Sequence, residues 1–96
     1  MGDFRHKMKY KVGDKVKIKT WKEMEKEYEP VEYGYIILSN NLGFLLEMEE
    51  KLKKLNTNRI VTIRDIDKNN NSYAIKELSF EWSDDMIEYL VKEKIF

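Results

Sequence analysis

The 96-residue chain contains no cysteine, a single histidine (His6) and four glycines. Without cysteine the protein forms no disulfide, no thiolate metal site and no thiol nucleophile. One histidine argues against a histidine-based metal site or a catalytic triad, and the glycines form neither a Gly-x-Gly-x-x-Gly nor a Walker-type phosphate loop. The sequence therefore predicts a protein that is not an enzyme and that binds no cofactor and no metal.

The sequence also lacks long hydrophobic runs. Its longest uninterrupted apolar run, Tyr35–Leu38, has four residues, whereas about 20 residues are needed to cross a bilayer. No apolar stretch follows the basic residues near the N-terminus, so the pattern of a secretory signal is missing. Together with the absence of cysteine, these features predict a cytoplasmic protein without a membrane partner.

The composition nevertheless favours a folded domain. Hydrophobic residues make up 42% of the chain and aromatic residues 12%, which is more apolar surface than intrinsically disordered chains contain. A length of 96 residues fits one domain, and no linker or internal repeat divides the sequence. We expect residues 1–9 to form a flexible leader and residues 10–96 to form a single domain.

Basic and acidic side chains balance at 18 each, but they are arranged in blocks. Residues 1–22 carry eight basic against two acidic side chains, a net charge of +6, and residues 23–50 carry one basic against eight acidic, a net charge of −7. Residues 51–68 carry six against two (+4), and residues 69–96 carry three against six (−3). Either these blocks neutralise one another as solvated faces, or they give the surface a basic and an acidic edge that steer a partner protein.

The first half of the chain predicts two strands around a short helix. Residues 15–19 alternate lysine with aliphatic residues, which is typical of a half-buried strand. Thr20 and Glu23 form a Thr-x-x-Glu capping box that begins a helix, and Pro30 ends that helix. Residues 33–38 are rich in aromatic and β-branched side chains and predict a second strand.

The second half predicts a longer helix, two strands and a last helical turn. Residues 44–55 carry an apolar stripe at helical spacing and three glutamate–lysine pairs four residues apart, with Asn56 as a left-handed cap. Residues 59–66 and 72–77 predict strands joined by an asparagine-rich hairpin loop. Ser83 is expected to cap a final helical turn, because apolar side chains follow it at helical spacing.

Several short strands with intervening helices predict a small, strongly bent sheet or barrel. We expect its core to contain Val16, Ile18, Met24, Ile36, Leu45, Met48, Leu52, Val61, Ile63, Tyr73, Ile75, Trp82, Met86 and Ile87.

Several landmarks follow one another between residues 10 and 88: a Lys11–Val16 opening strand, Thr20-Trp21-x-x-Met24, the apolar helix at 44–55, Val61–Ile63, Tyr73–Ile75 and Trp82–Ile87. This order resembles a group of small phage and prophage proteins of low-GC Gram-positive bacteria that look like SH3-like barrels. The chain departs from that pattern at residues 56–58, where the family usually has a glycine. The resemblance implies an α+β fold, a small SH3-like β-barrel of about five strands with one short and one longer amphipathic helix. It also implies a phage accessory protein that acts on host machinery, and it supplies no catalytic residues.

Aromatic and acidic side chains gather between residues 21 and 35. A core of this size cannot cover two tryptophans, six tyrosines and four phenylalanines, and exposed aromatic side chains dominate binding hot spots. Together with the resemblance, which implies action on host machinery, this predicts that the chain binds a host protein, as an inhibitor of a host defence system. The predicted partner-binding residues are Trp21, Tyr28, Tyr33, Tyr35, Glu25 and Glu29. In the alternative interpretation, Trp21 and one tyrosine simply fill the core.

Three other functions stay open at this point. The basic run from Arg5 to Lys22 has aromatic residues interleaved and is typical of a single-stranded nucleic-acid or RNA-binding barrel, although the glutamates of residues 23–32 would repel the phosphate backbone. A sponge for a small nucleotide signal and a structural role in a phage particle are the others. Asp65 and Asp67 begin like a calcium loop, but the central glycine and the final glutamate of such a loop are missing, so a hairpin is expected there.

Overall fold

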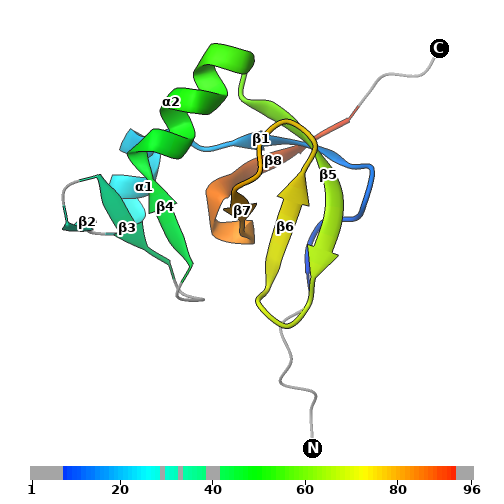
Figure 1. Cartoon of the computed structure of the whole chain (residues 1–96), viewed down its shortest axis with the longest axis horizontal. Helices are drawn as coiled ribbons and strands as arrows, with labels where there is room; N and C mark the ends of the chain where they lie inside the picture. Colours follow the sequence, from blue (N-terminus) through cyan, green and yellow to red (C-terminus); the bar gives the residue numbers. More distant parts are fainter. Residues whose placement is uncertain (1–7, 29, 33, 39–41, 93–96) are drawn as a thin grey trace, which may run out of the picture.

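The computed structural model describes residues 8–28, 30–32, 34–38 and 42–92; residues 1–7 of the predicted leader lie outside these ranges. The described elements are β1 (Lys15–Ile18), α1 (Trp21–Glu27), β2 (Pro30–Glu32), β3 (Tyr35–Ile37), β4 (Gly43–Leu45), α2 (Leu46–Leu55), β5 (Ile60–Asp67), β6 (Ser72–Ile75), β7 (Glu81–Trp82), the 3₁₀ turn η1 (Asp84–Met86) and β8 (Ile87–Val91). They form a five-stranded sheet and a three-stranded sheet. In Figure 1 the three-stranded sheet lies with α1 and α2 on one side of the molecule, and the five-stranded sheet lies on the other.

The five-stranded sheet has the order β7-β6-β5-β1-β8, and all of its pairs are antiparallel. The predicted strands at the start of the chain and on both sides of the asparagine loop are confirmed. Asp67 holds that loop, because its Oδ1 accepts the backbone N–H groups of Asn69 and Asn70 at 3.0 and 3.2 Å. Asn71 adopts a left-handed conformation with φ of 53°, which asparagine tolerates better than most residues.

A β-bulge divides β5 into two halves. Ile63 pairs with Ile75, but Asp65 pairs with Ala74, so Arg64 is an extra residue in the ladder. Before the bulge Val61 and Ile63 are buried, whereas after it Asp65 and Asp67 alternate outward. Since alternate residues of a strand face opposite sides, the bulge places these two aspartates on the outer face of the sheet.

The short helix α1 begins as the sequence predicts. The Thr20 hydroxyl accepts the Glu23 backbone N–H at 3.1 Å, and Glu23 Oε1 accepts the Thr20 N–H at 3.0 Å. This second bond is the largest cause that lowers the pKa of Glu23. The buried Glu49 of α2 also accepts the Trp21 backbone N–H, so one carboxylate links α2 to the first turn of α1.

The predicted helix at residues 44–55 begins too early. Residues 43–45 form β4 and pair with β3, and the helix α2 begins at Leu46. In the strand, Phe44 is fully buried while Leu45 is only partly buried. The expectation that Leu45 belongs to the core and the omission of Phe44 are both corrected, because strand alternation replaces helical periodicity at these positions.

Phe44 connects the two sheets. Its ring stacks on Trp21 with centroids 5.8 Å apart, and it lies 6.4 Å from the ring of Trp82 in β7. The buried core therefore runs without a break from α1 through β4 to the five-stranded sheet. It contains Val16, Ile18, Trp21, Met24, Ile36, Leu38, Phe44, Met48, Leu52, Val61, Ile63, Tyr73, Ile75, Trp82, Met86 and Ile87.

The C-terminal part differs from its prediction. Ser83 forms no side-chain cap, a single 3₁₀ turn follows it, and Ile87–Val91 is the strand β8 rather than a helical turn. Residues 87–91 form a strand and not a helix because they pair with β1. The predicted left-handed cap at Asn56 is also wrong: Asn56 is extended, and Arg59 has the positive φ of 57°.

The fold is thus α+β, with a five-stranded antiparallel sheet, two helices and a second, three-stranded sheet. Within the described residues the five-stranded sheet ends at β7 and β8, which do not pair with each other. The sheet is therefore not closed into a barrel.

The position of Phe44 predicts a difference between two neighbouring alanine variants. Phe44→Ala leaves a cavity between two tryptophans and is expected to cost about 3–5 kcal/mol of the free energy of unfolding. Leu45→Ala removes a half-buried side chain and is expected to cost less than about 2 kcal/mol. Urea denaturation followed by circular dichroism measures both, and equal losses would contradict the strand assignment of β4.

Candidate interaction surfaces

The predicted partner-binding residues do not form one exposed cluster. Trp21 is only 8% exposed and stacks on Phe44, so its ring belongs to the core. Its Nε1 donates to the Glu25 Oε1 at 2.5 Å, and Glu25 is exposed on α1. Of the two interpretations left open for Trp21, the structure favours core filling. Tyr33 and Glu29 lie outside the described residues.

Tyr35 and Tyr28 are half-buried. The ring of Tyr35 covers Gly43 on the neighbouring strand β4 so closely that a Cβ built on Gly43 would lie 2.4 Å from the ring. Aromatic rings that cover a glycine of an edge strand stabilise the sheet. Tyr28 packs against the core at the end of α1. Both tyrosines therefore have a structural role, and only part of each ring is open to a partner.

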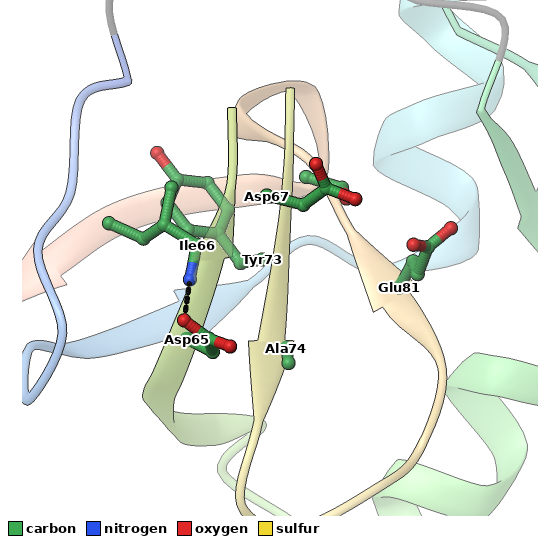
Figure 2. Close-up of a pocket in the computed structure, with 7 residues that line it drawn as sticks. Asp65, Ile66, Asp67, Tyr73, Ala74 and Glu81 are labelled. Atoms are coloured by element: carbon green, nitrogen blue, oxygen red, sulfur yellow. Dashed lines mark hydrogen bonds between the residues drawn. The ribbon is translucent and has the colours of Figure 1, made fainter. Parts of the chain in front are cut away.

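A hollow that the sequence did not single out lies on the outer face of the β5–β6 hairpin and β7 (Figure 2). It has a volume of about 210 Å³. Its lining residues are Asp65, Ile66, Asp67, Ser72, Tyr73, Ala74 and Glu81. We call this region the acidic hollow, because three of its side chains are carboxylates.

Strand register explains why the carboxylates gather there. Ala74 in β6 lies opposite Asp65 in β5 and opposite Glu81 in β7, so the three residues form one row across the sheet. The small side chain of Ala74 leaves the space between the two acids open. Asp67 lies two residues further along β5, and the side chain and backbone N–H of Asn70 lower its pKa. The hollow is thus a negatively charged depression.

Tyr73 lines the hollow and connects three segments of the chain. Its hydroxyl donates to the Asp84 Oδ1 at 2.5 Å and accepts the backbone N–H of Tyr10 at 3.1 Å, and the rings of Tyr10 and Tyr73 meet edge to face at 6.0 Å. Burial, followed by the bond to Asp84, raises the pKa of Tyr73 well above its ordinary value. The hydroxyl therefore stays protonated and acts as a fixed link between η1 and residue 10.

The opposite charge gathers at the other end of the same sheet. Lys15 and Lys17 of β1 lie opposite Val91 and Tyr89 of β8. The ammonium group of Lys17 lies 5.6 Å from the centre of the Tyr89 ring, within the range of a cation–π contact. We call Lys15, Lys17 and Tyr89 the basic face.

Part of this surface pattern is visible in the sequence. The alternation of lysines in residues 15–19 predicts an outward basic row, and the structure has it on β1. For the aspartates of β5 the sequence predicts only a place in a hairpin. Their gathering with Glu81 depends on the bulge at Arg64 and on the β6–β7 register, neither of which has a local sequence signal.

Comparison of the chain with protein-family models, with curated proteins and with solved structures gives no match. Within the described ranges, no helix is long and apolar enough to cross a membrane. The same residues contain no group of three or more histidine, aspartate or glutamate side chains placed to hold a metal ion.

The role of Tyr73 can be tested with a pair of tyrosine variants. Tyr73→Phe removes the hydroxyl and leaves the Asp84 carboxylate and the Tyr10 N–H without this partner, so we expect a loss of about 1–3 kcal/mol in the free energy of unfolding. Tyr10→Phe keeps the backbone N–H and the ring contact and should lie within about 0.5 kcal/mol of wild type. The two values are compared by urea denaturation at neutral pH. If both variants have the same free energy of unfolding, the hydrogen bonds of the Tyr73 hydroxyl do not stabilise the fold.

Proposed function

We propose that the chain is a non-catalytic, phage-type accessory module that binds a protein of the host cell and inhibits a host defence system. The observation that carries the binding proposal is the separation of opposite charges on one sheet, with the acidic hollow on β5–β7 and the basic face on β1 and β8. The origin and the defence target come from the sequence resemblance alone.

The distance between the two charged regions supports this proposal. Lys15 lies opposite Thr62 on β5, and Asp65 is three residues further along that strand. At about 3.3 Å per residue, the acids of the hollow begin roughly 10 Å beyond the lysine row, which exceeds a Debye length of ~8 Å at physiological salt. Glu77, whose carboxylate accepts the Thr62 N–H at 3.0 Å, lies closer to that row and belongs to neither region. Opposite charges at that separation do not neutralise each other, and they orient an approaching protein of complementary charge.

Beyond the α+β class, we also propose a more specific fold for the chain. We infer an SH3-like arrangement because β5, β6 and β7 form a meander, β1 pairs with β8, and a 3₁₀ turn precedes β8. Along the chain, β1 and β8 are the first and last strands. The segment from α1 to α2 is then an insertion between the first two strands of that arrangement. Small modules of this kind bind partners through surfaces that vary while the sheet stays constant.

Affinity capture with charge-neutralised variants tests the binding proposal. The immobilised chain is incubated with an extract of a low-GC Gram-positive bacterium at ~50 mM and ~500 mM salt, and captured proteins are identified by mass spectrometry. Because paired rim charges steer association, we expect a reproducible partner at low salt, less of it at high salt, and roughly tenfold less with the double variant Asp65→Asn/Glu81→Gln.

The control variant Glu47→Gln/Glu50→Gln removes the same two charges from the exposed side of α2. It should retain the partner within about twofold, since surface charges outside an interface contribute little. If nothing is captured reproducibly at low salt, or if both double variants lose the partner equally, the acidic hollow does not bind it. Capture of a protein unrelated to defence would remove the inhibitor part of the proposal.

A second candidate function has an observation of its own. The basic face combines two lysines with the exposed ring of Tyr89, a combination that suits phosphate contact and base stacking of a single-stranded nucleic acid. Against it, the same sheet carries the acidic hollow, which repels a continuous phosphate backbone. Protein binding therefore remains the first proposal.

A fluorescence titration decides the nucleic-acid candidate. Labelled mixed-sequence single-stranded DNA and RNA are titrated with the chain in ~50 mM salt, where phosphate-dominated binding is strongest. Binding that weakens with added salt and is reduced by Lys15→Ala/Lys17→Ala, but not by Lys22→Ala/Lys26→Ala on α1, would favour this candidate over the first. No measurable binding at that salt concentration removes it.

A further inference from the structure

The strand β8 is an edge strand with an exposed apolar surface. It is the last strand in the order β7-β6-β5-β1-β8, and among the described strands it pairs only with β1. Tyr89 is 47% and Leu90 is 37% exposed, and they are two of the four large hydrophobic side chains exposed in the described ranges. An edge of this kind presents unpaired backbone N–H and C=O groups to another chain.

The sequence around this edge is complementary to itself. Glu88 and Lys92 lie two residues before and two residues after Leu90, and Tyr89 and Val91 lie on either side of it. When two identical strands pair antiparallel with the two-fold axis at Leu90, Glu88 faces Lys92 of the second copy and Tyr89 faces Val91 of the second copy. Cross-strand pairs of opposite charge, and of aromatic with β-branched residues, both stabilise antiparallel sheets.

We propose that two copies of this chain associate through β8, antiparallel and with the two-fold axis at Leu90, so that their five-stranded sheets become one continuous sheet. The contact is isologous: the same residues of both copies are used, and the assembly closes as a dimer rather than growing into a fibre. Leu90 contacts its own counterpart at the axis, and two Glu88–Lys92 pairs flank it.

The local geometry of β8 supports this register. The register of β8 against β1 shifts between Lys17 and Ile18, so Glu88 is an extra residue in that ladder, whereas Tyr89, Leu90 and Val91 pair regularly with β1. The three central residues of the proposed contact are therefore in regular strand geometry, and the irregularity lies at its end.

Repulsion between the β1 lysines of the two copies does not oppose the β8–β8 contact. The lysine rows of the two β1 strands would be separated by three strand spacings of about 4.8 Å, roughly 14 Å in all, beyond the ~8 Å Debye length at physiological salt. The acidic hollow lies at the β5–β7 end of each sheet and stays open in the dimer. The association thus leaves the acidic hollow free for a partner, whereas Tyr89 of the basic face becomes part of the dimer contact.

A cysteine-free chain allows a direct cross-linking test of the two-fold axis. In Leu90→Cys the only two thiols of a dimer face each other across the axis, and opposite residues of an antiparallel pair have Cα separations of about 4.5–5.5 Å, within the range of a disulfide. We expect Leu90→Cys to form a covalent dimer under mild oxidation at least about tenfold faster than Leu55→Cys, because the paired strands hold the two thiols together. Leu55, 61% exposed on α2, supplies the control thiol outside β8.

A charge-exchange series tests the register by sedimentation equilibrium of the full chain. Glu88→Lys and Lys92→Glu each place like charges opposite each other twice in the dimer, so each is expected to raise the dissociation constant about tenfold. The double variant restores opposite charges and should return within about threefold of wild type. The proposal is overturned if wild type is monomeric up to about 1 mM, if Leu90→Cys cross-links no faster than Leu55→Cys, or if the double variant behaves like the single ones.

Discussion

The burial of Phe44 between Trp21 and Trp82 is the contact on which the two halves of the structure depend. Phe44 belongs to the three-stranded sheet, Trp21 to α1 and Trp82 to the five-stranded sheet, so one ring joins all three parts. Face-to-face and tilted aromatic contacts add to the apolar area that these large side chains bury. The carboxylate of Glu49 supports the same junction from α2. Because the junction is built from rigid, interlocked side chains, the five-stranded sheet is held as a firm platform for its outer surface.

The outer surface owes its charge pattern to one irregular residue. In an uninterrupted β5, Asp65 and Asp67 would face the side of Val61 and Ile63, which is the core. The extra residue Arg64 reverses the alternation and turns the aspartates outward, where Glu81 joins them across Ala74. The lysines of β1 face outward by simple alternation at the other end of the sheet. The sheet therefore carries two separated regions of opposite charge although the net charge of the chain is zero, and this separation supports the proposal of an oriented protein partner.

The sequence predicts those parts of the fold that have a local cause. Alternation defines β1, the Thr20–Glu23 box begins α1, and Asp67 with its asparagines makes the hairpin. The two helix predictions that are wrong have the same cause, which is strand pairing with residues distant in the sequence. Phe44 lies at helical spacing from Met48, and Leu90 from Met86, but Phe44 pairs with β3 and Leu90 with Val16 of β1 at the far end of the chain. Pairing partners override local periodicity. The acidic hollow depends on a bulge and on two strand registers, so its residues could be seen in the sequence while their neighbourhood could not.

The separation of charge on the sheet is the central claim, and paramagnetic probes in NMR measure it directly. Small nitroxides of opposite charge collect by sign near charged surfaces, and they broaden nearby amide signals. The structure predicts that the cationic probe broadens the amides of Asp65, Ala74 and Glu81 more than the anionic probe does, and that the order is reversed at Lys15, Lys17 and Tyr89. Both differences should shrink as salt is raised. Equal broadening by the two probes in both regions would contradict the account, because the charge blocks would then neutralise one another on the folded surface.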